Sequence, residues 1–266
     1  MNDTFEFKRF ALLLKKTIFE RPMQLIGLTG LILAAALILY SIVVYTVGWQ
    51  AAQSISFIWG FVGGGCFLSA AVFGYFNTNA SGSAYLTLPA STFEKWLSGI
   101  IIAGVLFTGV FLLFYRLVDT TFVSAYHNSL DKNSTDYRKM FDAVAVLPYS
   151  NDNNVFRQSM ALYVNLAGAM LVGSLYFNRV SAIKVALVYC GVIGIIYFLN
   201  MALATVFFNH VDQANPFYNV FIKAGTGVGI IELPSTASKT GELSARFIIP
   251  AILWLTAFVR LREKEI

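Results

Sequence analysis

The chain has 266 residues, of which 57% are hydrophobic and only 12% are charged, whereas a typical soluble domain carries roughly 25% charged residues. This composition excludes an ordinary soluble protein and indicates an all-α, polytopic membrane protein, with residues 1–266 forming one transmembrane domain. The formal net charge is +5, and the two cysteines, Cys66 and Cys190, both lie inside apolar runs. The chain therefore offers neither a disulfide framework nor a C-x-x-C pair.

The first segment, residues 1–22, contains the amphipathic stretch FEFKRFALLLKKTIFE. On a helical wheel its apolar residues share one side and its charged residues lie on the other. The apolar side holds Phe7, Phe10, Ala11, Leu14 and Ile18, and the charged side holds Lys8, Arg9, Lys15, Lys16 and Glu20. The pattern predicts an interfacial helix attracted to anionic lipid; a frayed leader is the alternative. No cleavable signal peptide is expected, because the next apolar run is long enough to stay in the bilayer.

Five apolar runs are long enough, or nearly so, to cross the roughly 30 Å hydrocarbon core of a membrane. They cover residues 23–45, 55–76, 97–115, 158–177 and 183–207. A sixth run, residues 247–259, offers only thirteen residues between Arg246 and Arg260. That is about 20 Å of helix, so both arginines would have to snorkel toward the interfaces. We expect six transmembrane helices.

The positive charges favour one orientation of these helices. With six spans and the N-terminus inside, eleven of the 19 Lys and Arg residues, Arg179 among them, fall in inner segments. The other eight are spread mainly over two long outer loops. By the positive-inside rule we expect both termini to lie in the cytoplasm.

The two outer loops are residues 119–157 and 208–246, and loops of this length are usually functional or disordered. The first is polar, and the stretch YRKMFDAVAVL within it predicts a small helical cap. The second contains the apolar but glycine-broken stretch PFYNVFIKAGTGVGII, residues 216–231. Counting it as a span would place the C-terminal tail outside, so a re-entrant or surface-lying segment before the last span is expected instead.

The loop between the second and third spans, residues 81–96, carries its own helix start in YLTLPASTFEKW. Ser91 and Glu94 have the S-x-x-E spacing of a capping box, in which each side chain bonds a backbone N–H of the first turn. Pro89 ends the preceding segment. Phe93 and Trp96 then fall on one face of the new helix. Either this face docks on another protein, or the helix lies on the membrane surface.

Polar residues are rare inside the spans. Lysine, arginine, aspartate and glutamate are missing from the middle of every predicted span, which disfavours ion-coupled transport. Asn165 and Asn200 are the strongly polar exceptions; they predict either interhelical hydrogen bonds or polar contacts on a substrate path. Gly60 and Gly64 have the G-x-x-x-G spacing of a close helix contact, either within the bundle or at a homodimer face.

Enzyme motifs are missing from the sequence. The two histidines, His127 and His210, lack zincin spacing, the stretch SGSAY falls one glycine short of a nucleophile elbow, and there is no P-loop. We therefore expect no enzyme, no metal site and no cofactor on this chain, and no nucleic-acid partner.

Three stretches carry a resemblance to a known family: YLTLPASTFEKWLSG, GSLYFNRVSAIKVAL and the closing VRLREKEI. Together with the expected topology they resemble a compact, Bacteroidetes-type family of bacterial membrane proteins similar to permease subunits of type-2 ATP-binding-cassette (ABC) exporters. The resemblance implies a homodimer or paired permease and a separate ABC ATPase subunit, which would hold the ATP and Mg.

In such exporters the loop after the second span forms a coupling helix that docks on the ATPase. By position, the resemblance implies that six residues make this contact: Leu88, Pro89, Ser91, Phe93, Glu94 and Trp96. The alternative for Trp96 is an interfacial aromatic belt. The expected function is ATP-driven export of a hydrophobic or amphipathic substrate; the alternative is a non-transporting scaffold or assembly factor that binds envelope proteins.

Overall fold

The computed structural model describes residues 4–77, 79–150, 152–177, 181–208, 211–215, 219–224, 227–232 and 234–264. Within these ranges the protein is an all-α polytopic membrane protein with six helices long and apolar enough to cross a membrane. They are Met23–Thr46, Trp49–Val72, Thr92–Ser129, Asn154–Tyr176, Ala182–Phe207 and Lys239–Glu263. The predicted number of spans is confirmed.

Several spans are assembled from α-helical and π-helical elements. The first half of the described chain contains α1 (Phe7–Glu20), η1 (Met23–Gly27), α2 (Leu28–Thr46), α3 (Trp49–Ile58), η2 (Trp59–Gly64), α4 (Gly65–Val72), η3 (Gly74–Asn77), α5 (Asn79–Leu86), α6 (Thr92–Ile100), η4 (Ile101–Leu106) and α7 (Phe107–Ser129). The second half contains α8 (Tyr137–Ala143), α9 (Asn154–Tyr176), α10 (Ser181–Phe207), β1 (Val211–Asn215), β2 (Asn219–Ala224), β3 (Gly227–Glu232), α11 (Ser235–Leu243), η5 (Ser244–Ile248) and α12 (Ile249–Glu263). In the described residues η1, η2, η4 and η5 are π-helical and η3 is a 3₁₀ turn.

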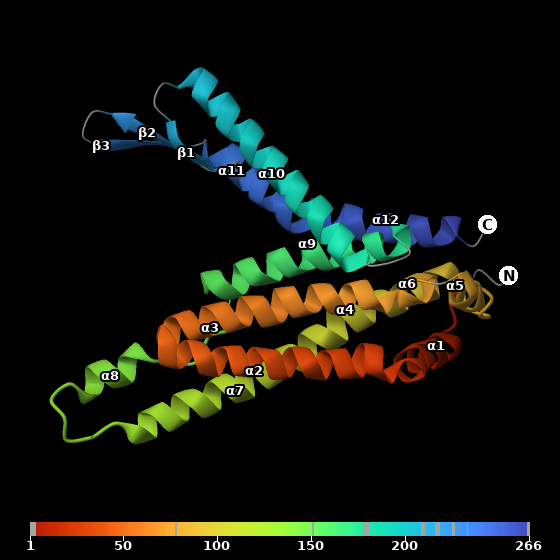
Figure 1. The fold of residues 1–266 in the computed structure, drawn as a ribbon, viewed down its shortest axis with the longest axis horizontal. Helices are drawn as coiled ribbons and strands as arrows, with labels where there is room; N and C mark the ends of the chain where they lie inside the picture. The colour runs from red at the N-terminus through yellow and green to blue at the C-terminus, as the bar shows by residue number, and fades with distance from the viewer. Residues whose placement is uncertain are drawn as a thin grey trace.

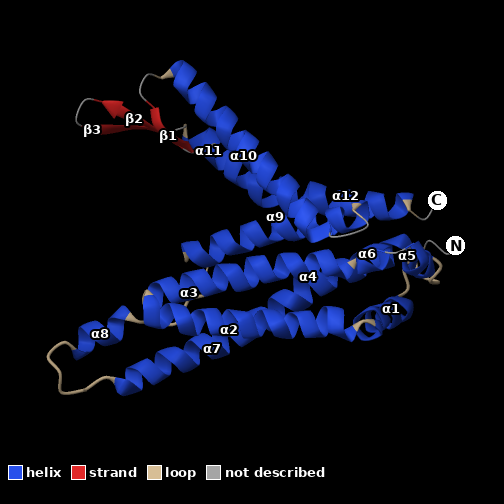
Figure 2. Cartoon of the chain, in the orientation of Figure 1, coloured by secondary structure: helices blue, strands red, loops and turns tan. Residues whose placement is uncertain are grey.

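The spans form a bundle with two different ends (Figure 1). α1, α5, α6 and the last turns of α12 lie at the end where both chain termini lie, and α8 and the strands lie at the opposite end. α10 leans away from α2, α4 and α7 toward the small sheet, which is the one β element drawn in Figure 2. We call the first of these the termini end and the second the far end.

The core of the bundle is aromatic. Phe57, Phe61 and Phe111 are fully buried, and the ring of Phe61 lies 4.5 Å from that of Tyr163 on α9, centroid to centroid. Large aromatic side chains bury much apolar surface, and such offset or edge contacts add further stabilisation. By contrast, almost none of the apolar side chains of α10 are buried, so this helix presents its surface to lipid or to another protein.

Close helix contacts in this core depend on glycine. A Cβ atom at Gly64 would lie 2.3 Å from Cγ2 of Ile32 on α2, and one at Gly60 would lie 2.8 Å from Cβ of Ala36. Both glycines are buried against the first span. Of the two roles that the G-x-x-x-G spacing predicts, the structure gives packing within the bundle and places neither glycine on an outward face.

We expect Gly64→Ala to lower the free energy of unfolding by about 1–3 kcal/mol, because the added methyl group overpacks the contact with Ile32. The matched control is Gly63→Ala, whose Cβ atom would make an ordinary contact of 3.6 Å with the Trp59 ring. Unfolding of both variants by sodium dodecyl sulfate in mixed micelles measures the difference. Equal stability of the two variants would contradict the packing role of Gly64.

The third span is longer than predicted. It begins at Thr92 and runs to Ser129, whereas the sequence predicted residues 97–115 with an outer loop from residue 119. The helix continues through Arg116 and Asp119 because both side chains are satisfied: Arg116 donates to the Leu147 carbonyl at 2.9 Å, and Asp119 is buried among hydrogen-bond donors. The longer helix therefore carries two charged residues beyond the predicted span, toward its far end.

The sixth span is also longer, Lys239–Glu263 in place of residues 247–259. The two arginines that bounded the short prediction are paired along the helix, Arg246 with Glu242 at 3.4 Å and Arg260 with Glu263 at 2.7 Å. Neighbouring opposite charges one helical turn apart lower the cost of continuing the helix past a charged residue. The snorkelling that a short span would require is thus unnecessary.

The segment expected to be re-entrant or surface-lying forms β-strands, which the sequence analysis did not predict. Its described residues form β2 and β3 of an antiparallel sheet in the order β1-β2-β3, with Val220 paired to Ile231 and Ile222 to Gly229. The apolar residues of this run are β-branched or aromatic and suit strands. Residues 216–218 and 225–226 of the expected segment lie outside the described residues, as do Arg179 and His210.

The polar outer loop of residues 119–157 contains the predicted small helix. α8 covers Tyr137–Ala143, the first seven residues of the stretch expected to form a cap. His127, near the end of α7, contacts the carbonyl oxygens of Phe141 and Val144 through Nε2 at 3.2 and 2.9 Å. These contacts tie α8 to the third span.

Candidate functional site

The loop before α6 has the local structure that its sequence predicts. Ser91 is the N-cap of α6: its Oγ accepts a hydrogen bond from the Glu94 backbone N–H at 3.3 Å, and Oε2 of Glu94 accepts one from the Ser91 N–H at 2.9 Å. This is the reciprocal pattern of a capping box. The start of α6 is therefore fixed in direction by its own residues.

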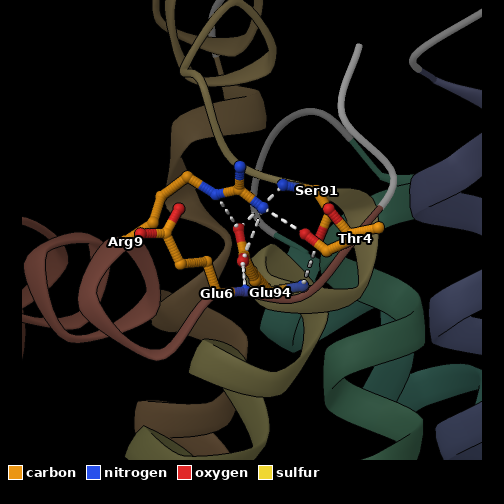
Figure 3. A network of polar contacts seen from close by, with 5 residues as sticks. All are labelled: Thr4, Glu6, Arg9, Ser91 and Glu94. Carbon is orange, nitrogen blue, oxygen red and sulfur yellow. Dashed lines mark hydrogen bonds and ion pairs between the residues drawn. The ribbon is translucent and has the colours of Figure 1, made fainter.

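Glu94 does more than cap α6, because its carboxylate also holds α1 (Figure 3). Arg9 donates from Nε to Oε2 and from Nη2 to Oε1, each at 2.8 Å, and the Glu6 backbone N–H donates to Oε1 at 2.8 Å. The Glu94 side chain is fully buried, whereas that of Arg9 is 21% exposed. A two-point contact of this kind fixes distance and angle together.

The same contact favours the protonated, positively charged form of the Arg9 side chain. The hydrogen bond with Glu94 raises the pKa of the Arg9 guanidinium above its ordinary value. Arg9 also donates from Nη2 to the Thr4 carbonyl, which folds the residues before α1 over the capped turn. The sequence placed Arg9 on the basic, lipid-attracted face of the first helix, but the structure turns it toward α6.

α1 itself is a regular helix, so the frayed alternative is excluded. Its buried residues are Phe10, Leu13 and Thr17, while Phe7 is 74% exposed. Phe7 and Ala11 of the predicted apolar side stay exposed, as residues that face lipid would be. The contact of Arg9 with Glu94 sets which side of α1 faces α6.

The aromatic face of α6 packs on the last span. Trp96 donates from Nε1 to the Trp254 carbonyl at 2.9 Å, and its ring lies 5.5 Å from that of Phe258. Phe93 lies 6.5 Å from Phe258 and 6.0 Å from Phe5, centroid to centroid. The face that the sequence left open to a docking partner or a membrane surface is therefore largely occupied by α12 and the N-terminal residues.

Lys95 is buried rather than extended toward the interface. Its Nζ donates to the Leu86 carbonyl at 2.8 Å, at the end of α5. A buried ammonium group needs such an acceptor, and a helix C-terminus favours a positive charge. The lysine joins the end of α5 to the start of α6 across the turn that contains Pro89.

The six residues predicted to contact an ATPase differ in how far their side chains are exposed. Pro89 and Phe93 are exposed, the latter by 42%, Leu88 and Trp96 are half-buried, and Ser91 and Glu94 are buried. The buried pair holds the turn in shape, and the outward surface consists of the turn at Leu88 and Pro89 with the edge of Phe93. Sequence reasoning missed Arg9, Trp254 and Phe258, which lie far away in the chain.

The two asparagines of the spans have different surroundings. Asn165 on α9 donates from Nδ2 to the Ala161 carbonyl and to the Ala245 carbonyl of η5, both at 2.8 Å. This is the interhelical hydrogen bond that the sequence offered as one of two roles. Asn200 on α10 has a buried Nδ2 that finds no hydrogen-bond partner among the described residues.

A second polar cluster lies toward the far end, around Asp119. Its Oδ1 accepts hydrogen bonds from Tyr40 at 2.8 Å and from the Gln53 amide at 2.9 Å, and its Oδ2 accepts one from the Leu147 N–H at 2.7 Å. Asp119 is 1% exposed. The cluster joins three spans to the outer loop, and the sequence, which assigned Asp119 to that loop, missed it.

An apolar groove runs between the second, fourth and fifth spans, with a volume of about 550 Å³. Trp59, Met170 and Ile183 line it, as do both cysteines. A volume of this size lies in the range of small-molecule sites. Trp59 and Ile183 are exposed on the outer surface of the bundle, by 68% and 57%, so the groove is open to apolar compounds from outside.

Neither metal-ligand geometry in the described residues nor similarity to known proteins adds to this description of the site. Among the described residues, no group of three His, Cys, Asp or Glu side chains is placed to hold a metal ion. Comparisons with protein-family models, curated proteins and solved structures found no match to this chain.

Proposed function

We propose that this chain is the membrane-spanning permease subunit of an ATP-driven exporter, coupled to a separate cytoplasmic ATPase that binds the ATP and Mg. In this proposal the capped turn between the second and third spans is the coupling element. The chain spans the inner membrane of a bacterium, with both termini on the cytoplasmic side. It pairs with a second permease, identical or related. The chain itself is non-catalytic.

One observation carries the proposal: the turn at Pro89 is exposed, while the residues just behind it are fixed to three separate helices. Glu94 holds α1 through Arg9, Lys95 holds the end of α5, and Trp96 holds α12. A displacement applied at the turn would therefore reach the first, third and sixth spans together. A coupling helix must transmit movement in this way, and bundles respond to such shifts by rigid-body motion.

Two further features support the proposal. The outward surface of α10 leaves a full span for contact with a second permease or lipid. The apolar groove of about 550 Å³ suits hydrophobic or amphipathic cargo better than small ions.

The test is affinity purification of the tagged chain from its native membrane. Mass spectrometry then identifies the proteins that copurify with it. The wild type is expected to bring an ABC ATPase, and Pro89→Ala/Phe93→Ala is expected to lose most of it, because both replaced side chains are exposed on the turn. Trp96 is left intact, since its hydrogen bond to α12 makes its replacement a packing change.

The matched control is Phe141→Ala, which removes an aromatic ring that is 39% exposed at the far end, against 42% for Phe93. It should keep the ATPase. Retention of the ATPase by the double variant would show that the turn is not the docking surface. Absence of any ATPase from the wild-type sample would reject the exporter proposal.

A second candidate is a scaffold or assembly factor that does not transport and binds envelope proteins. The observation that favours it is the pair of folded structures at the far end, α8 and the three-stranded sheet, which project beyond the bundle (Figure 1). Envelope proteins in the purified sample without an ATPase, and their loss on deletion of residues 211–232, would select this candidate.

A further inference from the structure

A second cavity, with a volume of about 460 Å³, lies at the junction of α1 and the first span. Its walls come from η1, the start of α2 and the end of the second span. The lining residues are Met23, Gln24, Gly27, Leu28, Leu31, Ala71 and Gly74. Met23 is 83% exposed and Leu31 is 65% exposed, so the cavity opens toward the membrane.

The cavity has a polar end and an apolar end. Gln24 and Gly74 lie where the first span begins and just past the end of the second, at the level of the membrane surface. Leu28 and Leu31 follow along the first span, so the walls reach about 10 Å into the membrane at 1.5 Å per residue. A ligand that fills this space must be polar at one end and apolar at the other.

The positively charged side chain of Arg21 lies at the polar end of the cavity. Arg21 donates from Nη1 to Oε1 of Gln24 at 3.4 Å, and its guanidinium carbon lies 4.0 Å from the ring centroid of Tyr75, the residue after Gly74. Arg21 thus contacts both rims of the cavity. Among the described residues, its guanidinium makes this one hydrogen bond, and a guanidinium offers five N–H donors.

The carboxylate nearest to Arg21 in the chain, that of Glu20, is engaged by a tyrosine hydroxyl. Glu20 accepts a hydrogen bond from the Tyr75 hydroxyl at 3.2 Å. Burial, followed by the nearby Glu20, raises the pKa of Tyr75 to about 12, so the hydroxyl stays protonated and neutral. Lys15 and Lys16, earlier on α1, are exposed and do not line the cavity, so Arg21 is the cation at its polar end.

We infer that this cavity binds one anionic glycerophospholipid from the leaflet at the termini end, with its phosphate at Arg21 and Gln24 and one acyl chain along Leu28 and Leu31. Guanidinium groups bind phosphate oxygens in paired hydrogen bonds, and lipid is the amphipathic molecule present at that depth. The π-helical turn η1 contributes Met23, Gln24 and Gly27 to the site, and such turns are frequent at functional sites. The site does not depend on the proposed ATPase.

Native mass spectrometry of the full chain in detergent, titrated with phosphatidylglycerol or with phosphatidylcholine, tests this site. The wild type is expected to bind phosphatidylglycerol at least about fivefold more tightly, the effect of one basic side chain near an anionic headgroup. Arg21→Gln should remove that preference. Gly27→Leu should weaken phosphatidylglycerol binding at least about tenfold, because the new side chain occupies the cavity.

Two controls match these variants. Lys16→Gln removes one positive charge from α1 outside the cavity, and Gly30→Leu adds the same side chain at a glycine with no atom within 4 Å of its added Cβ. Both should bind phosphatidylglycerol within about twofold of wild type. A Cβ atom added at Gly27 also makes only ordinary contacts, the nearest with the Met23 sulfur at 3.8 Å.

Two results would overturn the inference. If Lys16→Gln loses as much affinity as Arg21→Gln, the attraction is the diffuse charge of α1 rather than a site. If Gly27→Leu binds phosphatidylglycerol as wild type does, the acyl chain does not lie in this cavity. Arg21→Gln and Gly27→Leu act by charge and by shape, so each tests the site without the other.

Discussion

Glu94→Ala is expected to lower the free energy of unfolding by about 3 kcal/mol and to release α1 from the bundle. The carboxylate accepts two hydrogen bonds from Arg9 and one each from the Glu6 and Ser91 backbone N–H groups. Hydrogen bonds to a charged group contribute about 1.5–3 kcal/mol each, and donors left buried without an acceptor add a further cost. Hydrogen–deuterium exchange over residues 7–20 measures the release of α1, and unfolding by sodium dodecyl sulfate measures the stability.

Glu94→Gln separates the two roles of this side chain. Glutamine can serve in a capping box, but it cannot pair with Arg9 through two carboxylate oxygens. We expect Glu94→Gln to retain the α6 cap and to lose only the α1 contact, so its stability should lie between wild type and Glu94→Ala. If all three proteins exchange equally fast over residues 7–20, α1 is held by its apolar residues and not by Glu94.

Asp119→Ala is expected to lower the free energy of unfolding by about 3–5 kcal/mol. Three buried donors, from Tyr40, Gln53 and the Leu147 backbone, would lose their acceptor, and each unsatisfied buried group costs about 1–3 kcal/mol. The loss should be greatest where the outer loop meets the bundle. Faster hydrogen–deuterium exchange at residues 144–150, together with a lower unfolding midpoint, checks this result.

The control for Asp119 is Asp142→Ala. Asp142 is an exposed carboxylate on α8, in the same outer segment, and exposed substitutions usually change stability by less than about 0.5 kcal/mol. Asp119→Asn keeps one oxygen acceptor and should fall between the two. An Asp119→Ala protein as stable as Asp142→Ala would mean that water replaces the carboxylate, and that the cluster does not hold the loop.

The features that the sequence could predict depend on residues close together in the chain. The cap of α6 follows from Ser91 and Glu94, three residues apart, and the spans follow from apolar composition. The Arg9–Glu94 contact joins residues 85 positions apart, and the Trp96–Trp254 contact joins residues 158 apart. No local pattern specifies such pairs, because each depends on how the helices pack.

The errors concern charged residues and strand pairing. The third and sixth spans were predicted too short because charged residues were taken to end a span, yet Asp119 is satisfied by groups far away in the chain and Arg246 pairs with Glu242 one helical turn before it. The strands were missed because an apolar run with glycines was judged by its hydrophobicity rather than by pairing. A charged or glycine-containing segment can be judged only once its neighbours are known.

The π-helical turns have a consequence for insertions and deletions in this chain. A π turn holds one residue more than an α turn, and one residue corresponds to about 100° of rotation around a helix. Removing a single residue from Trp59–Gly64 would let this turn close as an α turn, so α3 and α4 would keep nearly their present relative rotation and Phe57 and Cys66 their neighbours. The same deletion within α3 or α4 would instead rotate one half of the second span against the other by about 100° and would disrupt the core, so the π turn is the place where this span can lose a residue.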